Sequence, residues 1–129
     1  MYEALIMLSE ALNPSVEEYA QEVRSFYESN IGEKPTIEMA KENFRVIFKG
    51  IEFSVDKNCD EHVVLESKEL ASFAKPNERA EISRSKCRFE ISSTNDTDMV
   101  YFNDYLFLIQ SAEELGKVWA FSPLDGEFM

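Results

Sequence analysis

The only histidine of the chain, His62, lies beside two other potential metal ligands. Cys59 and Asp60 precede it by three and two residues, and zinc accepts a thiolate, a carboxylate or an imidazole. A structural zinc site needs four ligands, however, and no second Cys/His pair occurs elsewhere in the sequence. We therefore interpret Cys59–His62 as a polar turn and expect neither a metal nor a cofactor.

Other catalytic signatures are missing from the sequence. A single histidine does not favour Ser/His/Asp or Cys/His catalysis. Asp96 and Asp98 alternate as in a calcium loop, but the downstream glutamate of an EF-hand is absent. Nothing distinguishes any two of the 25 acids as an acid/base pair, and the isolated glycines form no phosphate-binding loop. The sequence predicts no catalytic residues and no enzyme; an enzyme that uses carboxylates alone is the weakest alternative.

The net charge of −12 is concentrated towards the two ends of the sequence. Residues 1–42 hold nine acids and three bases, and residues 96–129 hold seven acids and one base. Residues 43–95 hold nine of each and are neutral. Such a field repels nucleic acid and anionic membranes and attracts a basic protein. The simpler alternative is that the acids only keep the protein soluble.

Five residues are predicted to contact such a partner. Glu18 and Glu22 lie on the polar face of an amphipathic helix, opposite its apolar stripe. Asp104 and Glu114 surround Phe107 on the outer side of a later helix, and a phenylalanine among acids could anchor a basic partner. Alternatively, a loop or the tail Leu124–Met129 buries Phe107.

A basic stripe is the other candidate interaction surface. In an expected strand over Glu81–Ser93, the side chains of Arg84, Lys86 and Arg88 alternate on one face, where they could hold a phosphate or an acidic partner. The alternative is a solvated strand face paired with acids such as Glu52 or Asp56.

The elements that position these residues predict one α+β domain over residues 1–129. We expect an open, mostly antiparallel sheet with two main helices on one face, in a ferredoxin-like βαββαβ topology with an insertion. Gly50 leaves open whether one bulged strand or two short strands surround it. The expected strands are Tyr2–Ser9, Thr36–Ala40, Asn43–Lys49, Ile51–Val55, Glu81–Ser93 and Val118–Phe121, with a short extended piece at His62–Leu65. The expected helices begin at Asn13-Pro14, with Asn13 as the cap, at Ser67, and at either Asp98 or Asn103; they end near Asn30–Gly32, at Ala74 and at Gly116.

The compartment is expected to be the cytoplasm. Glu3 and Glu10 interrupt the apolar N-terminal run, unlike a secretory signal, and no run approaches the roughly 20 apolar residues of a membrane helix. Two cysteines are too few for a disulfide framework, and Cys87 alternates with apolar residues as a small buried hydrophobe does.

In general character the chain resembles the small acidic bacterial immunity proteins of contact-dependent growth inhibition. The resemblance depends on the short chain, a pI of about 4.5, the α+β pattern and the acidic helix face that carries Glu17, Glu18, Glu22 and Glu28; no family motif matches. It implies a non-catalytic antitoxin-type inhibitor that blocks a basic, nuclease-like toxin domain. The alternative is a small-molecule-sensing or regulatory ferredoxin-like domain acting as a homodimer. Monomer and homodimer both remain open.

Overall fold

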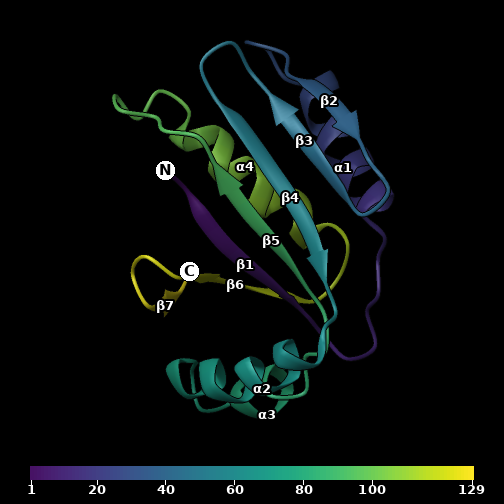
Figure 1. Cartoon of the computed structure of the whole chain (residues 1–129), viewed down its shortest axis with the longest axis vertical. Helices are drawn as coiled ribbons and strands as arrows, with labels where there is room; N and C mark the ends of the chain where they lie inside the picture. Colours follow the sequence, from purple (N-terminus) through teal and green to yellow (C-terminus); the bar gives the residue numbers. More distant parts are fainter.

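One antiparallel sheet forms the centre of the molecule. The computed structural model describes residues 1–129, and its seven strands lie in the order β2-β3-β4-β5-β1-β6-β7 (Figure 1). None of the helices is long and apolar enough to cross a bilayer. The strands are β1 (Glu3–Leu8), β2 (Thr36–Met39), β3 (Asn43–Ile47), β4 (Glu52–Asn58), β5 (Arg88–Ser93), β6 (Val118–Ser122) and β7 (Glu127–Phe128). The helices are α1 (Val16–Glu28), α2 (Glu61–Leu70), the 3-10 turn η1 (Ala71–Phe73), α3 (Arg79–Ile82) and α4 (Phe102–Glu113).

The topology agrees with the predicted α+β fold and its two main helices on one face. Strands β5 and β6 are both antiparallel to β1, which lies between them, so β5-α4-β6 is a split βαβ unit. Strands β1 and β4 flank β5 in the same way. The order β4-β5-β1-β6 therefore forms a ferredoxin-like centre. The β2-β3 pair extends it at one edge, and α2, η1 and α3 are inserted between β4 and β5.

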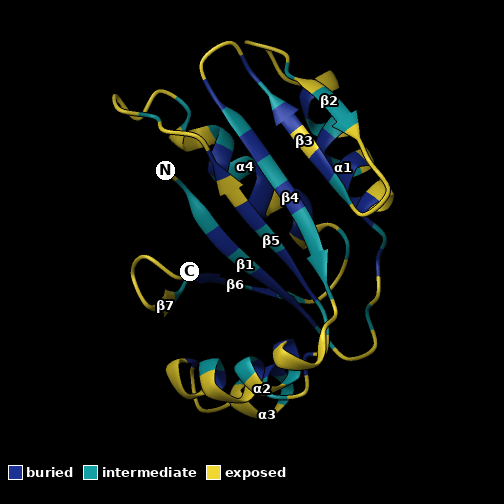
Figure 2. Ribbon diagram, in the orientation of Figure 1, coloured by how far each residue is buried: buried dark blue, intermediate teal, exposed yellow.

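Buried positions run along the central strands of the sheet (Figure 2), and they form two cores on its opposite faces. Ile6 and Leu8 of β1 point into the larger core, which α1 and α4 cover. Met7 points to the other face because side chains alternate along a strand. There it contacts Trp119 of β6 and Ile82 of α3 in the smaller core. The inserted helices thus give the second face of the sheet its own apolar cover.

The N-terminus of α1 differs from the prediction in its capping residue. Ser15 is the cap, and Asn13 is not. The Ser15 hydroxyl accepts a hydrogen bond from the Glu18 amide at 3.1 Å, and the Glu18 carboxylate accepts one from the Ser15 amide at 3.2 Å. Asn13 and the Pro14 carbonyl instead accept hydrogen bonds from the Lys57 ammonium group. The chain therefore enters α1 two residues later than the Asn-Pro signal suggests.

Residues 61–87 are more helical than predicted. The expected extended piece His62–Leu65 lies in α2, and Ser67 does not cap that helix but lies buried within it, where its hydroxyl donates to the Val63 carbonyl at 2.8 Å. The expected strand Glu81–Ser93 is half wrong, because α3 ends at Ile82 and β5 begins only at Arg88. Alternation over a few residues fits a turn as well as a strand. Tertiary burial of Ile82 decides the outcome here.

The two cysteines form a disulfide, contrary to the interpretation of Cys87 as an isolated hydrophobe. Cys59 follows β4 and Cys87 precedes β5. The two strands pair Asn58 opposite Arg88, so the next residues of each strand face one another, with their Cα atoms 4.2 Å apart. The disulfide closes the base of the segment that holds α2, η1 and α3. Spacing in the sequence could not reveal this pairing, because it depends on strand register.

We predict that breaking this disulfide destabilises the protein. The bond joins residues 28 positions apart, and a closed loop of that length contributes about 3.6 kcal/mol to the free energy of unfolding. Urea denaturation of the oxidised protein, of the reduced protein and of the double variant Cys59→Ser/Cys87→Ser measures the effect. The double variant should have the same urea midpoint as the reduced protein, and reductant should not change that midpoint. Equal urea midpoints for oxidised and reduced protein would contradict the prediction.

Candidate functional site

A shallow groove runs between the outer faces of α1 and α4. Its volume is about 360 Å³. Glu22 of α1 and Glu114, the residue that caps the C-terminus of α4, are its only charged lining residues. The remaining lining residues are Ser25, Phe26, Gln110 and Ser111. The groove therefore presents two carboxylates and an aromatic ring to solvent, without a base.

The floor of the groove is aromatic. The Phe26 ring packs against the Phe107 ring with centroids 4.5 Å apart, and Tyr27 approaches Phe107 from the side at 6.5 Å. Phe107 is half-buried, so it is not an exposed anchor among acids. The expected alternative cover, the tail Leu124–Met129, is also wrong, because Phe26 of α1 covers the ring. The sequence could not show this, since it does not state which helix lies beside α4.

Asp104 lies near the other end of α4 and does not line the groove. Its carboxylate accepts a hydrogen bond from the Tyr27 hydroxyl at 2.6 Å. Partial burial raises the pKa of Asp104, the Tyr27 hydrogen bond opposes that shift, and the charge of Glu33 adds to it. Burial and Asp104 together raise the pKa of Tyr27. The Tyr27–Asp104 hydrogen bond connects the two helices, so the Asp104 carboxylate is not free for a partner.

Glu18 also lies outside the groove, since it belongs to the capping box of α1. Burial lowers the pKa of the neighbouring Lys57, and the charge of Glu18 opposes that shift. Of the five predicted contact residues, the structure thus brings Glu22 and Glu114 to one groove. Phe107 does not line the groove but packs against Phe26, which does. Glu18 and Asp104 have structural roles instead: Glu18 caps α1, and Asp104 connects α4 to α1 through Tyr27.

The acids at the two ends of the sequence are mostly free of ion pairs. Among the acids of residues 1–42 and 96–129, only Glu10 and Glu38 contact a base. Two of the few bases in these segments, Arg24 and Lys34, line a different hollow beside β2. The negative field predicted from the sequence is therefore not neutralised at the α1–α4 groove.

The predicted basic stripe does not form a cationic surface. Arg84 and Lys86 precede β5 and approach Glu10 at 3.8 and 3.5 Å. Arg88 is buried and forms ion pairs of 2.9 Å with Glu66 and 2.8 Å with Glu90. The expected pairing with Glu52 or Asp56 is wrong, because only Arg88 lies in a strand, whereas Arg84 and Lys86 lie in the connection between α3 and β5. These cations hold the inserted segment to the sheet.

The Cys59–His62 cluster holds no metal site. Cys59 is bound in the disulfide, and His62 is an exposed residue whose Nε2 lies 3.3 Å from the Asn58 side-chain amide. No group of three or more His, Cys, Asp or Glu side chains has an arrangement suited to a metal ion.

Sequence reasoning overlooked Phe26 as a contributor to the site. From the sequence, Phe26 fits the apolar stripe of its helix and nothing marks it as a site residue. The sequence does contain one indication, the adjacent aromatic residues Phe26 and Tyr27 near the end of α1. Two adjacent side chains of a helix point in different directions, so both rings cannot lie at the centre of one buried face. Tyr27 is buried and Phe26 is left at the boundary with solvent.

We predict that Phe107→Ala lowers the free energy of unfolding by about 2 kcal/mol, since truncation of a half-buried ring costs less than the 3–5 kcal/mol of a fully buried one. Phe73→Ala is the matched control because Phe73 is 61% exposed, and it should cost less than about 1 kcal/mol. Urea midpoints measure both variants. If Phe107→Ala is as stable as the unmodified protein, the ring does not join the helices.

We predict that Asp104→Asn is slightly more stable than the unmodified protein at neutral pH, by less than about 1 kcal/mol, because Asp104 is only partly buried. The raised pKa of Asp104 means that the folded protein disfavours its ionised form. As the pH falls through that pKa, Asp104 becomes neutral and the advantage of the variant should disappear. Thermal midpoints measured from pH 7 to pH 3 test this. If the stability advantage of Asp104→Asn instead grows as the pH falls, the pKa of Asp104 is not raised in the folded protein.

The α1–α4 groove is therefore the candidate functional site, on the evidence of its uncompensated carboxylates and aromatic floor. Searches of protein-family models, of curated proteins and of solved structures find no match to this chain.

Proposed function

We propose that this chain is a non-catalytic binding module that captures a basic protein through the α1–α4 groove. The observation that carries the proposal is the pairing of Glu22 and Glu114 across an aromatic floor without a base nearby. Carboxylates on two walls suit the cationic end of a lysine or arginine side chain. The ring of Phe26 favours a cation above it.

The wider charge distribution supports the same reading. Most acids of the terminal segments have no ion pair, and such an excess of negative charge speeds the encounter with a positively charged protein. Lys117 is the single base of residues 96–129, and Glu81 neutralises it at 2.8 Å. The surface therefore attracts cations at long range and offers defined contacts at short range.

The biological role that fits this module best is inhibition of a basic toxin domain, as in the acidic immunity proteins. An inhibitor of a nuclease gains from negative charge because the active site that it covers is built to bind phosphates. The proposal places the protein in the cytoplasm. Disulfides are rare in that compartment, so we expect the Cys59 and Cys87 thiols to be largely free there and the packed cores to hold the fold.

Charge reversal in the groove tests the proposal. The tagged protein is used to capture a partner from the cells that produce it, and the partner is identified and purified. We predict that Glu22→Lys/Glu114→Lys lowers the association rate by about tenfold or more, with an effect that shrinks as salt rises. Association and dissociation rates are measured separately by surface plasmon resonance.

The matched control is Glu61→Lys/Glu69→Lys, which makes the same change in net charge on exposed positions of α2. This control should change the association rate much less than the groove variant does. Equal effects of the two variants would show that only net charge matters, and capture of no basic protein would end the proposal.

A further inference from the structure

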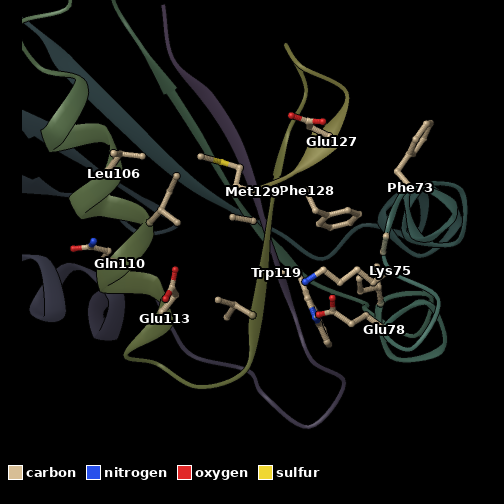
Figure 3. A pocket seen from close by; sticks show the side chains of 15 residues that line it. Phe73, Lys75, Glu78, Leu106, Gln110, Glu113, Trp119, Glu127, Phe128 and Met129 are labelled. Carbon is tan, nitrogen blue, oxygen red and sulfur yellow. The ribbon is translucent and has the colours of Figure 1, made fainter.

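A cavity lies along the outer edge of β6, which β7 and Met129 cover only from Ala120 to Ser122, away from the α1–α4 groove. Its volume is about 710 Å³, and ten of its fifteen lining residues are hydrophobic. Figure 3 shows β6 crossing the cavity with α4 on one side and the η1–α3 segment on the other. Leu106 and Ile109 of α4 line one wall, and Phe73 and Ile82 line the other.

The outer backbone edge of β6 is unpaired at the start of the strand, at Val118. Strand β7 pairs only Phe128 with Phe121 and Glu127 with Ser122, and the Met129 amide donates to the Ala120 carbonyl at 2.9 Å. Backbone groups of alternate residues point to the same side of a strand. The N–H and C=O of Val118 therefore point to the free edge, beyond the end of β7.

The helical layers extend past this edge, whereas the sheet layer stops. On one face, Val118 and Ala120 lie beneath α4; on the other, Trp119 packs against the inserted segment. The cavity thus has the position and the apolar walls that one more strand of the sheet would require. Side chains of an added strand would alternate between the two walls.

We infer that the free edge of β6 binds an extended segment of another protein by strand addition, and that this segment is apolar with basic flanks. Charge at the rim decides its chemistry, since Glu78, Glu113 and Glu127 line the cavity with Lys75 as the only base. A second copy of this chain is a poorer occupant, because its net charge is −12 and acidic rims would meet. This inference goes beyond the α1–α4 proposal and does not depend on it.

The only tryptophan of the chain reports directly on this cavity. Trp119 lines it, and its indole N–H donates to the Glu78 carboxylate at 2.9 Å. The probe is the synthetic acetylated peptide KKVLVLVKK, titrated into the oxidised full-length protein while the Trp119 emission is recorded. We expect a saturable change in emission and a shift of the Val118 amide resonance.

Three matched controls separate strand addition from other modes of binding. The same peptide with alternate backbone nitrogens methylated should not bind, because it lacks the donors for the β6 edge. The peptide EEVLVLVEE should not bind, because its glutamates would be repelled by the acids that line the cavity. Val118→Pro, which removes an outward N–H without removing a bond to β1, should weaken binding by about tenfold.

The wall is tested with two exposed apolar residues of similar exposure, Phe73 at 61% in the cavity and Leu65 at 63% on α2. Phe73→Ala should weaken peptide binding by about fivefold, and Leu65→Ala should leave it unchanged. The inference is overturned if the peptide gives no saturable signal, or if the methylated peptide binds equally well, as a general apolar pocket would allow. Self-association of the free protein through β6, seen by sedimentation, would also overturn it.

Discussion

The packing of α1 against α4 is the contact on which the proposed site depends. Three cross-helix interactions hold it: the Phe26–Phe107 ring contact, the Tyr27–Asp104 hydrogen bond, and a 2.6 Å bond from the buried Tyr19 hydroxyl to the Leu108 carbonyl. Since each helix crosses between strands of the same sheet, the ferredoxin-like topology brings the two helices together on one face. Only then do Glu22 and Glu114, far apart in the sequence, line a single groove.

The folded protein leaves most acids of the two terminal segments without an ion pair, although ion pairs would reduce the repulsion between them. Unpaired like charges destabilise a compact protein through mutual repulsion. The apolar cores on both faces of the sheet offset that cost. The ion pairs that do form are concentrated elsewhere: Arg88 with Glu66 and Glu90 connects the inserted segment to β5. The distribution of pairs therefore separates a framework from a free acidic surface.

Sequence patterns predicted the elements with strong periodicity and failed where burial depends on distant neighbours. The apolar stripe of α1, the alternation of β3 and β4 and the short apolar runs of β1 and β6 are local signals, and all of these elements exist. The turn at Gly50 resolved into two strands, and the later of the two starts considered for α4 was nearly right, since the helix begins at Phe102.

The failures have a common physical cause. Ile82 was predicted in a strand, but it lies on a short helix, where the small core that contains Met7 and Trp119 buries it. The disulfide depends on the register of β4 and β5, and the cover of Phe107 depends on which helix lies beside α4. Net charge, by contrast, is a property of composition, so the acidic ends could be predicted. Which acids share a groove could not be, because that follows from topology.

The most direct measurement of the central claim is hydrogen exchange of the protein alone and in complex with its captured basic partner. The account predicts that binding slows amide exchange in α1 and α4, most strongly around Glu22 and Glu114, while exchange in α2 stays the same. Protection confined to α2 and α3, with α1 and α4 unaffected, would contradict it.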